Sequence, residues 1–336
     1  MENESPLPLR RVLITGAAGF LGRSVVSALA QSREIDAVIA TDVRDVPPAR
    51  RVPGVIYEVM DVRSPELQGL LERRAVDAVV HLAATVPPGS GGDRDFEYSV
   101  DVLGTRNLLK ASLAAGVRHL VVASSGAAYG YHADNPAWIT EDQPLRGNAD
   151  FVCSHHKRLV EEMLASYRSR HPQLRQTVLR IGTILGDHAD NRVTALFDKP
   201  RLMAVRGRDS PFVFVWDEDV AGCILHAIAS GRTGCFNVAG DGALTLAQIA
   251  ALLRKPVLAV PAPLLRLGLR IGARLKISRC GPEQIDFLRY RPVLANDRLK
   301  QEFGYVPRKT SLEAFLAFKA ARAARRSLAA DASPQG

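Results

Sequence analysis

Cysteine is scarce in this sequence of 336 residues, and its spacing is irregular. No two cysteines form a C-x-x-C motif; the four are Cys153, Cys223, Cys235 and Cys280. This spacing argues against a zinc site and against a framework of disulfide bonds, so we expect no bound metal. Isolated thiols suit a reducing compartment, which predicts a cytoplasmic protein.

Aromatic residues and long apolar runs are also few. Only 6% of the residues are aromatic, and Lys and Arg do not gather in one patch, so the net charge of +9 does not indicate nucleic-acid binding. No apolar run approaches the ~18 residues of a membrane span, and the N-terminal MENESPLPLR lacks the apolar core of a signal peptide. We therefore expect no nucleic-acid partner and no transmembrane segment. The positive charge is compatible with an anionic small molecule or an anionic surface.

The sequence does contain a regular alternation of apolar strands and amphipathic helices. With 47% apolar and 24% charged residues, the composition is that of a globular protein, and the length suits two domains. Strands that are apolar throughout and separated by helices indicate a parallel sheet covered on both faces. We expect an α/β fold with a Rossmann-type, doubly wound sheet and strands at 11–15, 36–42, 55–61, 76–84, 118–125 and 176–184.

The regular alternation ends near residue 185. Short helices, loops and isolated strands follow, with strands expected at 212–216 and 235–240. This pattern predicts a nucleotide-binding domain over 1–185 and a smaller, irregular substrate domain over 186–322, whose segments interleave with the first. Residues 323–336 are expected to fray into a tail.

The segment TGAAGFLG, residues 15–22, closes the first strand and opens a helix. In that context the glycines predict a dinucleotide site. Gly16 permits a tight turn, Gly19 admits a pyrophosphate, and Gly22 lets the helix pack on the strand. The alternative is that the glycines serve only the turn. The cofactor contacts expected here are Gly16, Ala18, Gly19, Phe20, Leu21 and Gly22.

Two aspartates follow the second and third strands. Asp42 stands where an acidic side chain accepts both ribose hydroxyls of the adenosine, which favours NAD over NADP. Arg44 is close enough to meet a 2′-phosphate and keeps NADP as the alternative. Asp61 is placed to contact the adenine edge and Val62 to pack on its ring, although a solvated aspartate explains the position nearly as well.

Four separated motifs resemble one enzyme family. They are TGAAGFLG, HLAATV at 81–86, SSGAAYG at 124–130, and a lysine, Lys157, followed four residues later by Glu161. Together they resemble the extended short-chain dehydrogenase/reductases, which include nucleotide-sugar epimerases and dehydratases. FVFVWDEDVAGCI and RYRPVLANDRLKQEFGYVPRKTSLEAF extend the resemblance over nearly the whole chain.

The resemblance implies roles for individual residues. Ser125 matches the active-site serine or threonine that bonds the reacting substrate oxygen. Lys157 matches the lysine that holds the nicotinamide ribose and lowers the pKa of its neighbour. The loop beside that ribose is matched by Leu82, Ala83 and Ala84. The family also implies a homodimer formed by the helices near 96–115 and 151–170.

The catalytic tyrosine of the family is missing. The Tyr-x-x-x-Lys pattern places Cys153 in its position. A thiol, with a pKa of about 8.5 against about 10 for tyrosine, is acidic enough, especially near an ammonium, but it is several ångströms shorter. A bridging water or another group must then complete the proton transfer. The nearby alternatives are Tyr129, Tyr131, His155 and His156, and of the two adjacent histidines at most one faces the cofactor.

Two further departures lie in the same half of the site. Asp101 stands where the family usually has asparagine, which changes the usual proton relay. Trp216 stands where many sugar-nucleotide members have histidine, which indicates a different substrate pocket.

The second half contains two basic features. Residues 263–276 place Leu264, Leu267, Ile271 and Leu275 on one helical face and Arg266, Arg270 and Arg274 on another. Such a helix lies on an anionic membrane, covers an apolar pocket, or simply faces the core with a solvated basic stripe. Arg289 and Arg291 stand where sugar-nucleotide members hold a diphosphate, and Arg291 and Tyr129 are the expected substrate contacts beside Ser125.

We therefore expect an NAD-dependent epimerase, dehydratase or reductase that acts on a hydroxyl or keto carbon, with Ser125, Lys157 and Cys153 at the catalytic centre. The substrate is a small molecule, anionic or nucleotide-linked. One alternative is an NAD-binding sensor or assembly protein without redox turnover, because the tyrosine is missing. The other is a peripheral reductase of lipid-like or steroid-like alcohols, because of the amphipathic helix.

Overall fold

The structure, a computed structural model, describes residues 9–85, 93–189, 191–207, 209–274 and 284–331. Its centre is a seven-stranded sheet in the order β10-β6-β5-β4-β1-β2-β3, with every neighbouring pair parallel. The strands are β1 (Arg11–Thr15), β2 (Ala37–Asp42), β3 (Ile56–Val59), β4 (Ala78–His81), β5 (His119–Ser125), β6 (Arg175–Ile181) and β10 (Gly234–Val238). The sequence-based prediction of a Rossmann-type parallel sheet is confirmed.

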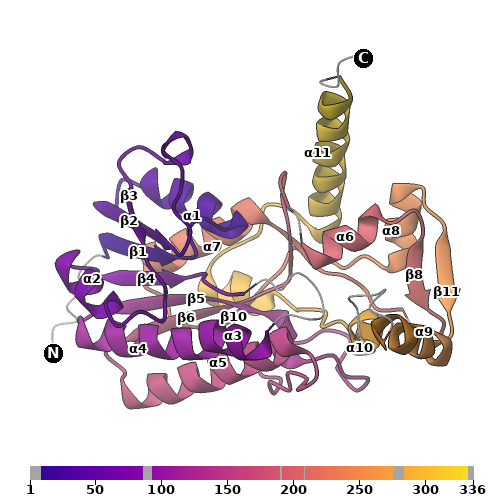
Figure 1. Ribbon diagram of the computed structural model, residues 1–336, viewed down its shortest axis with the longest axis horizontal. Helices are drawn as coiled ribbons and strands as arrows, with labels where there is room; N and C mark the ends of the chain where they lie inside the picture. The colour runs from indigo at the N-terminus through magenta and orange to yellow at the C-terminus, as the bar shows by residue number, and fades with distance from the viewer. Residues whose placement is uncertain (1–8, 86–92, 190, 208, 275–283, 332–336) are drawn as a thin grey trace.

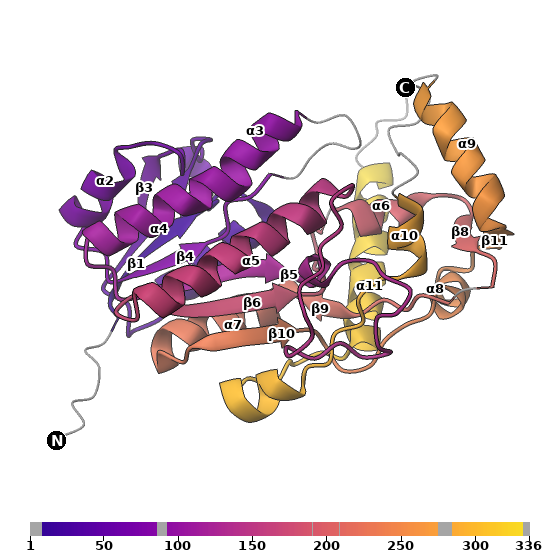
Figure 2. The same cartoon turned by 90° about the horizontal axis from the view of Figure 1, so that it is seen from below.

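Helices cover both faces of this sheet because side chains alternate along each strand. Val12 and Ile14 of β1 point into one core, and Leu13 between them points into the other. The first core is closed by α1 (Phe20–Ala30) and α7 (Asp217–Ser230). The second core is closed by α2 (Leu67–Arg73), α4 (Thr105–Ala114) and α5 (Val152–Arg170), and Figures 1 and 2 show these two layers.

The strand order places the carboxyl ends of β1, β4 and β5 together. The chain runs from β1 outward to β3 and then crosses back to β4 on the other side of β1, so the order reverses between β1 and β4. At such a point neighbouring loops diverge and leave a crevice, where ligands of open α/β sheets bind. The fold therefore directs attention to the loops after β1, β4 and β5.

One strand of the sheet comes from the second half of the chain. β10 pairs with β6 in parallel, from Gly234 opposite Thr177 to Val238 opposite Ile181. Sequence analysis predicted an isolated strand at 235–240. A strand is present there, but the prediction that it is isolated was wrong, because it belongs to the large sheet. The preceding helix, α7, packs beside α1 on the same sheet. Residues 217–238 therefore return to the first structural unit.

The remaining residues form a smaller region beside the sheet (Figure 1). Two small sheets, β7 with β9 and β8 with β11, surround an aromatic core that includes Phe197, Phe212 and Phe315. The elements here are β7 (Thr183–Leu185), α6 (Arg192–Asp198), β8 (Leu202–Val205), β9 (Phe214–Trp216), α8 (Leu246–Leu253), β11 (Val257–Val260), α9 (Ala262–Arg274), α10 (Gln284–Arg289) and α11 (Ser311–Asp331).

The short helical segments are η1 (Pro48–Arg50), α3 (Arg94–Tyr98), η2 (Ser99–Gly104), η3 (Gly126–Tyr129) and η4 (Leu299–Phe303). The last helix, α11, continues to Asp331, beyond residue 323 where we expected a tail. Within the described residues, no helix has both the length and the apolar character to cross a membrane.

Candidate cofactor and catalytic site

The glycine turn after β1 is required by its surroundings. Gly16 has a φ of +73°, and a Cβ there would lie 2.7 Å from the backbone nitrogen of Ala83. A Cβ on Gly22 would lie 2.2 Å from the carbonyl oxygen of Gly16. Gly19 differs, because its Cβ would meet that same oxygen at 3.1 Å and nothing closer. Gly16 and Gly22 thus serve the fold, whereas Gly19 chiefly leaves space above the turn.

The N-terminus of α1 fits an anionic group. Its N-cap is Gly19, which provides no side-chain hydrogen bond, and its first turn contains no acidic residue. The amide N–H groups of that turn carry partial positive charge and require an acceptor. A diphosphate is such an acceptor, so this turn fits the phosphates of a dinucleotide. The two side chains that follow, Phe20 and Leu21, pack against separate apolar cores on either side.

Asp42 borders the same turn. Its carboxylate accepts hydrogen bonds from the backbone N–H groups of Ala18 and Arg44, both at 3.0 Å. The exposed Arg44 side chain approaches this carboxylate to 3.4 Å through Nε. The carboxylate expected to bind a ribose therefore lies next to the proposed phosphate site, and the side chain of Arg44 contacts this carboxylate.

The two residues predicted to contact adenine have protein partners. Both carboxylate oxygens of Asp61 bind the guanidinium of Arg63, at 2.6 Å for the shortest contact. Hydrogen bonding from Arg63 lowers the pKa of Asp61. Val62 is buried against Gly104, where an added Cβ would lie 2.6 Å from the valine Cγ2. Their contacts with adenine stay predictions.

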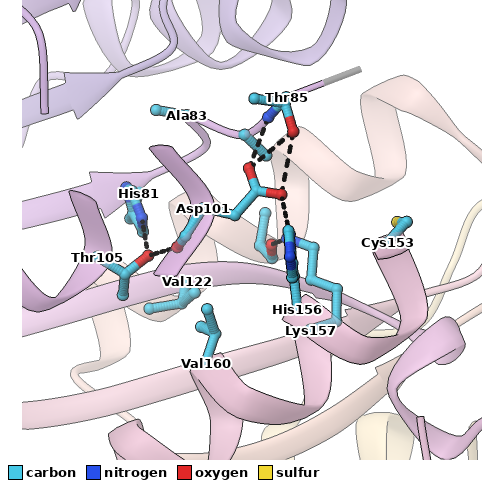
Figure 3. A pocket seen from close by; sticks show the side chains of 12 residues that line it. His81, Ala83, Thr85, Asp101, Thr105, Val122, Cys153, His156, Lys157 and Val160 are labelled. Atoms are coloured by element: carbon cyan, nitrogen blue, oxygen red, sulfur yellow. Dashed lines mark hydrogen bonds and ion pairs between the residues drawn. The ribbon is translucent and has the colours of Figure 1, made fainter. Parts of the chain in front are cut away.

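A cavity of about 30 Å³ lies at the carboxyl ends of β4 and β5. Loop residues after β4, the turn η2 and one face of α5 form its wall, as Figure 3 shows. The lining residues are His81, Ala83, Ala84, Thr85, Asp101, Thr105, Val122, Ala123, Cys153, His156, Lys157 and Val160. The first residue of the predicted loop, Leu82, packs instead against the core of the sheet.

The structure places Cys153 and Lys157 in this same wall. Successive helical turns bring them to one face of α5. The ammonium of Lys157 donates a hydrogen bond to the carbonyl oxygen of Ala123 at 3.0 Å. Ser125 ends β5 two residues later and is half-buried, and its Oγ accepts from the N–H of Ala127 at 3.2 Å. Ser125 therefore lies near the cavity by position in the strand but does not line it.

A carboxylate and an imidazole form a hydrogen bond with each other in the cavity wall. Nδ1 of His156 lies 3.0 Å from Oδ2 of Asp101. Thr85 donates to the other oxygen of Asp101 through its backbone N–H at 2.7 Å, and its hydroxyl bonds both oxygens. Burial alone raises the pKa of Asp101, but hydrogen bonds from His156 and Thr85 and the charge of Lys157 outweigh it and leave the pKa lowered.

Sequence analysis named Asp101 and His156 separately and did not pair them. They are 55 residues apart, and η2, the π-helical turn that carries Asp101, is not visible as a pattern. The available signal was chemical, because a carboxylate where an amide is expected requires extra donors. Thr85, which supplies two of them, was missed.

The histidine next to this pair has a structural role. His81 shares hydrogen bonds with the hydroxyls of Thr15 at 2.8 Å and Thr105 at 2.9 Å. Burial, together with the positive charge of Lys157, lowers the pKa of His81 to about 3, so the ring is neutral. Because both ring nitrogens are occupied, His81 does not exchange protons with a ligand.

Tyr129 lies in a buried polar network. Its hydroxyl donates to Asn237 and accepts from Arg180, each at 2.8 Å. Arg180 also pairs with Glu161 at 2.8 Å, and burial raises the pKa of Tyr129. The hydroxyl is therefore fully used within the protein, and we do not include Tyr129 among the proposed substrate contacts. Glu161 likewise acts as a partner of Arg180.

Arg291 lies among aromatic rings in the smaller region. Its guanidinium lies 3.7 Å from the centre of the Phe212 ring and donates to the carbonyl oxygen of Ser210. Among the described residues no carboxylate forms an ion pair with it, and its Nε has no partner. Burial lowers the pKa of Arg291. Asp209 acts on Arg291 only at longer range and does not offset its burial, so this buried guanidinium fits an anionic ligand group.

Across the part of the chain that the structure describes, no three His, Cys, Asp or Glu side chains lie close enough together to hold an ion. The described histidines at the cavity bind threonine hydroxyls or a single carboxylate.

Comparison with known proteins connects this arrangement to one family. Residues 12–239 match the family described as NAD dependent epimerase/dehydratase. An uncharacterized protein of Mycobacterium tuberculosis is 30% identical over 325 residues, which are 93% of this chain and 84% of that protein. Mouse UDP-glucose 4-epimerase is 29% identical over 200 residues, 55% of this chain and 56% of that enzyme.

Solved structures agree over most of the chain. A short-chain dehydrogenase/reductase superfamily protein from Agrobacterium tumefaciens, with bound NAD, superposes with a TM-score of 0.72 at 26% identity, covering 96% of this chain and 99% of that one. UDP-glucose 4-epimerase from Thermus thermophilus, in complex with NAD, gives a TM-score of 0.72 at 25% identity, with coverage of 94% and 99%.

Proposed function

Because the chain belongs to the NAD dependent epimerase/dehydratase family, we propose that it oxidises and reduces a hydroxyl-bearing carbon of a nucleotide sugar with NAD as its cofactor. The observation that carries the proposal is the shared position of the glycine turn and the Lys157 cavity at the carboxyl ends of β1, β4 and β5. UDP-glucose 4-epimerases among the relatives support the substrate class.

The residues of the nucleotide half hold the cofactor. The amides at the start of α1 bind its diphosphate, and the space above Gly19 admits it. Asp42 accepts the ribose hydroxyls and discriminates against a 2′-phosphate by charge. When bound, NAD supplies a hydride acceptor and, once reduced, a hydride donor. Lys157 fixes the nicotinamide end of the cavity, next to Ala83 and Ala84.

A separate group must take the proton that leaves the substrate hydroxyl. We assign this step to Nε2 of His156. Asp101 accepts the Nδ1–H bond, which holds the tautomer whose Nε2 carries a lone pair, and it stabilises the cation formed when Nε2 is protonated. Cys153 is too short to reach in place of a tyrosine, but the cavity between these groups has room for bridging water.

The substrate oxygen and its diphosphate bind to other residues. Ser125, at the end of β5, donates to the reacting oxygen, as the family match implies. Arg291 binds a phosphate oxygen, since its buried guanidinium has no carboxylate partner among the described residues. These contacts set the sugar carbon at the cavity mouth.

The experiment is a turnover assay with purified protein, NAD and a panel of UDP- and TDP-hexoses that includes UDP-glucose. We expect a new hexose or a keto sugar by chromatography, and no product from the Lys157→Ala variant. NAD binding without turnover of any sugar nucleotide would favour the alternative of an NAD-binding protein without redox activity. That alternative has one specific observation behind it, the cysteine at position 153.

A further inference from the structure

Helix α9 has two apolar faces, only one of which is covered. Leu265 is buried and, with Leu269, packs on the cluster formed around Val205 and Ile285. A second stripe, roughly 150° around the helix, consists of Leu264, Leu267 and Ile271. Their side chains are 61%, 56% and 51% exposed.

The exposed leucines change the interpretation of this helix. Sequence analysis left open whether Leu264, Leu267 and Ile271 face the core; the structure shows that they face outward. Leu275 lies outside the described residues. An ordinary surface helix needs only one apolar stripe to pack on its protein. A second exposed stripe marks a surface for binding something else.

A basic stripe runs directly beside the exposed apolar one. Arg266, Arg270 and Arg274 are exposed, and within the described residues none of them forms an ion pair. The sequence around them contains no acidic residue between Asp241 and Glu283. The same stretch contains Arg254, Lys255, Arg266, Arg270, Arg274, Lys276 and Arg279. The charge in this segment is therefore of one sign.

The helix is accessible from outside. Figures 1 and 2 show α9 with β8 and β11 at the end of the molecule farthest from β1 to β3. The strands beside it also carry exposed apolar side chains, with Met203 opposite Leu258 in the pairing of β8 and β11. This end of the molecule is therefore separated from the strands β1 to β3 of the large sheet.

The charge pattern decides what covers this face. Two copies of α9 packed together would bring their arginine stripes into contact without acidic partners, which is unfavourable in an apolar interface. A surface with dispersed negative charge and an apolar interior matches both stripes at once. We propose that α9 binds the protein to the surface of an anionic lipid bilayer, with Leu264, Leu267 and Ile271 in the acyl boundary and the arginines at the headgroups.

The test uses the full-length protein and sedimentation with vesicles. We expect binding to vesicles that contain phosphatidylglycerol, little binding to phosphatidylcholine alone, and a decrease as salt rises. Each Arg→Gln change in Arg266 and Arg270 is expected to lower the partition coefficient about fivefold. The matched control is Arg33→Gln with Arg50→Gln, two exposed arginines outside the helices predicted to form the dimer; it should bind as the parent does.

The apolar stripe is tested in the same assay. Leu264→Ser with Leu267→Ser should abolish sedimentation with anionic vesicles, whereas Leu312→Ser with Leu316→Ser, at exposed leucines of α11, should not. Circular dichroism confirms that these surface variants fold. Three results overturn the proposal: equal binding to neutral vesicles, binding unaffected by the α9 variants, or no binding at all. If the α9 variants instead alter only the mass measured by light scattering, the face joins two protein copies and the lipid proposal is wrong. None of these readouts requires a sugar substrate.

Discussion

Cys153 stands where the family has a tyrosine, and its side chain is too short to reach as far as the phenol would. It lines the cavity with Lys157, on the face of α5 that the spacing predicted. Its position, however, says nothing by itself about proton transfer, because reach decides that function. The chemistry of the site is therefore best separated by substitutions that change acidity, length and position one at a time.

Cys153→Ser should leave turnover nearly unchanged, because His156 rather than the thiol takes the proton. If the thiol itself were the acid or base, the loss in kcat would be about 10²–10⁴-fold. Cys153→Tyr restores the phenol, and it should raise hydride transfer if its absence limits the rate. Single-turnover absorbance of reduced NAD measures each variant. Loss of activity in Cys153→Ser with full activity in Ser125→Ala would contradict the proposed site.

Asp101→Asn should disable His156 without removing it. The amide then donates toward Nδ1 and favours the tautomer with its proton on Nε2, so kcat should fall about 10²–10⁴-fold while NAD affinity stays the same. Nitrogen NMR of histidine-labelled protein reports the tautomer without any substrate. His155→Gln is the matched control, because His155 does not line the cavity. An unchanged tautomer in Asp101→Asn would contradict the assignment.

Asp101 should also make stability depend on pH. Its folded-state pKa is lowered, so its contribution is present above the unfolded value of about 3.9 and is lost as pH falls through the folded value. The free energy of unfolding in urea should therefore differ between the parent and Asp101→Asn at pH 7, and this difference should shrink near pH 3. A difference that grows toward acid pH would have the wrong sign.

Asp42→Ala should weaken NAD binding more than NADP binding. The lost carboxylate leaves the ribose hydroxyls without a charge-assisted partner, at a cost of about 1.5–3 kcal/mol. Calorimetry on the parent should give tighter binding of NAD than of NADP. Equal affinities in the parent would show that Arg44, which already touches Asp42, accepts the 2′-phosphate.

At the scale of elements, the glycines of the turn from β1 into α1 have different roles. Gly16 and Gly22 are required by the fold, whereas Gly19 leaves space for the ligand. Gly22→Ala should destabilise the protein by about 1–3 kcal/mol, because its Cβ would overlap the backbone of Gly16 and Ala17. Gly19→Ala should cost much less stability and should weaken NAD binding instead. Thermal unfolding and calorimetry measure the two effects. Equal loss of stability in both variants would contradict this division.

The elements that sequence analysis predicted are those with local signals. The strands β1 to β5 are short, apolar runs bounded by helices, and the structure has them within about two residues of their predicted central positions. The glycine turn and Asp42 were predicted from their spacing after strands, whereas Cys153 and Lys157 were predicted from the resemblance to the family, and the structure places both in one cavity wall. β8 and β11 were missed, because each is short and pairs only with the other, 55 residues away. The Asp101–His156 contact was not predicted for the same reason, since contacts between distant segments leave no periodic pattern in the sequence.

At the scale of the whole molecule, α4 and α5 lie side by side on one face of the sheet (Figure 2). Beside them, Phe96 and Tyr98 of α3 are 50% and 40% exposed. We expect this face to form a homodimer through four helices, as the family implies. Light scattering at micromolar concentration should give twice the chain mass, and Phe96→Arg should reduce it. Trp138→Arg, at a side chain 47% exposed elsewhere, is the control. A monomeric parent protein would contradict the dimer.

The late strand β10 has a consequence for how the chain is made. During synthesis, residues 11–181 leave the ribosome with six strands of the sheet but without the strand that covers β6. Until residue 238 is available, β6 exposes a row of unsatisfied amide and carbonyl groups, a surface that promotes aggregation. A released fragment that ends at residue 185 should therefore aggregate more readily than the full-length chain, as measured by light scattering. The part of the smaller region from β7 to β9 is thus translated after β6 and before the last strand of the large sheet.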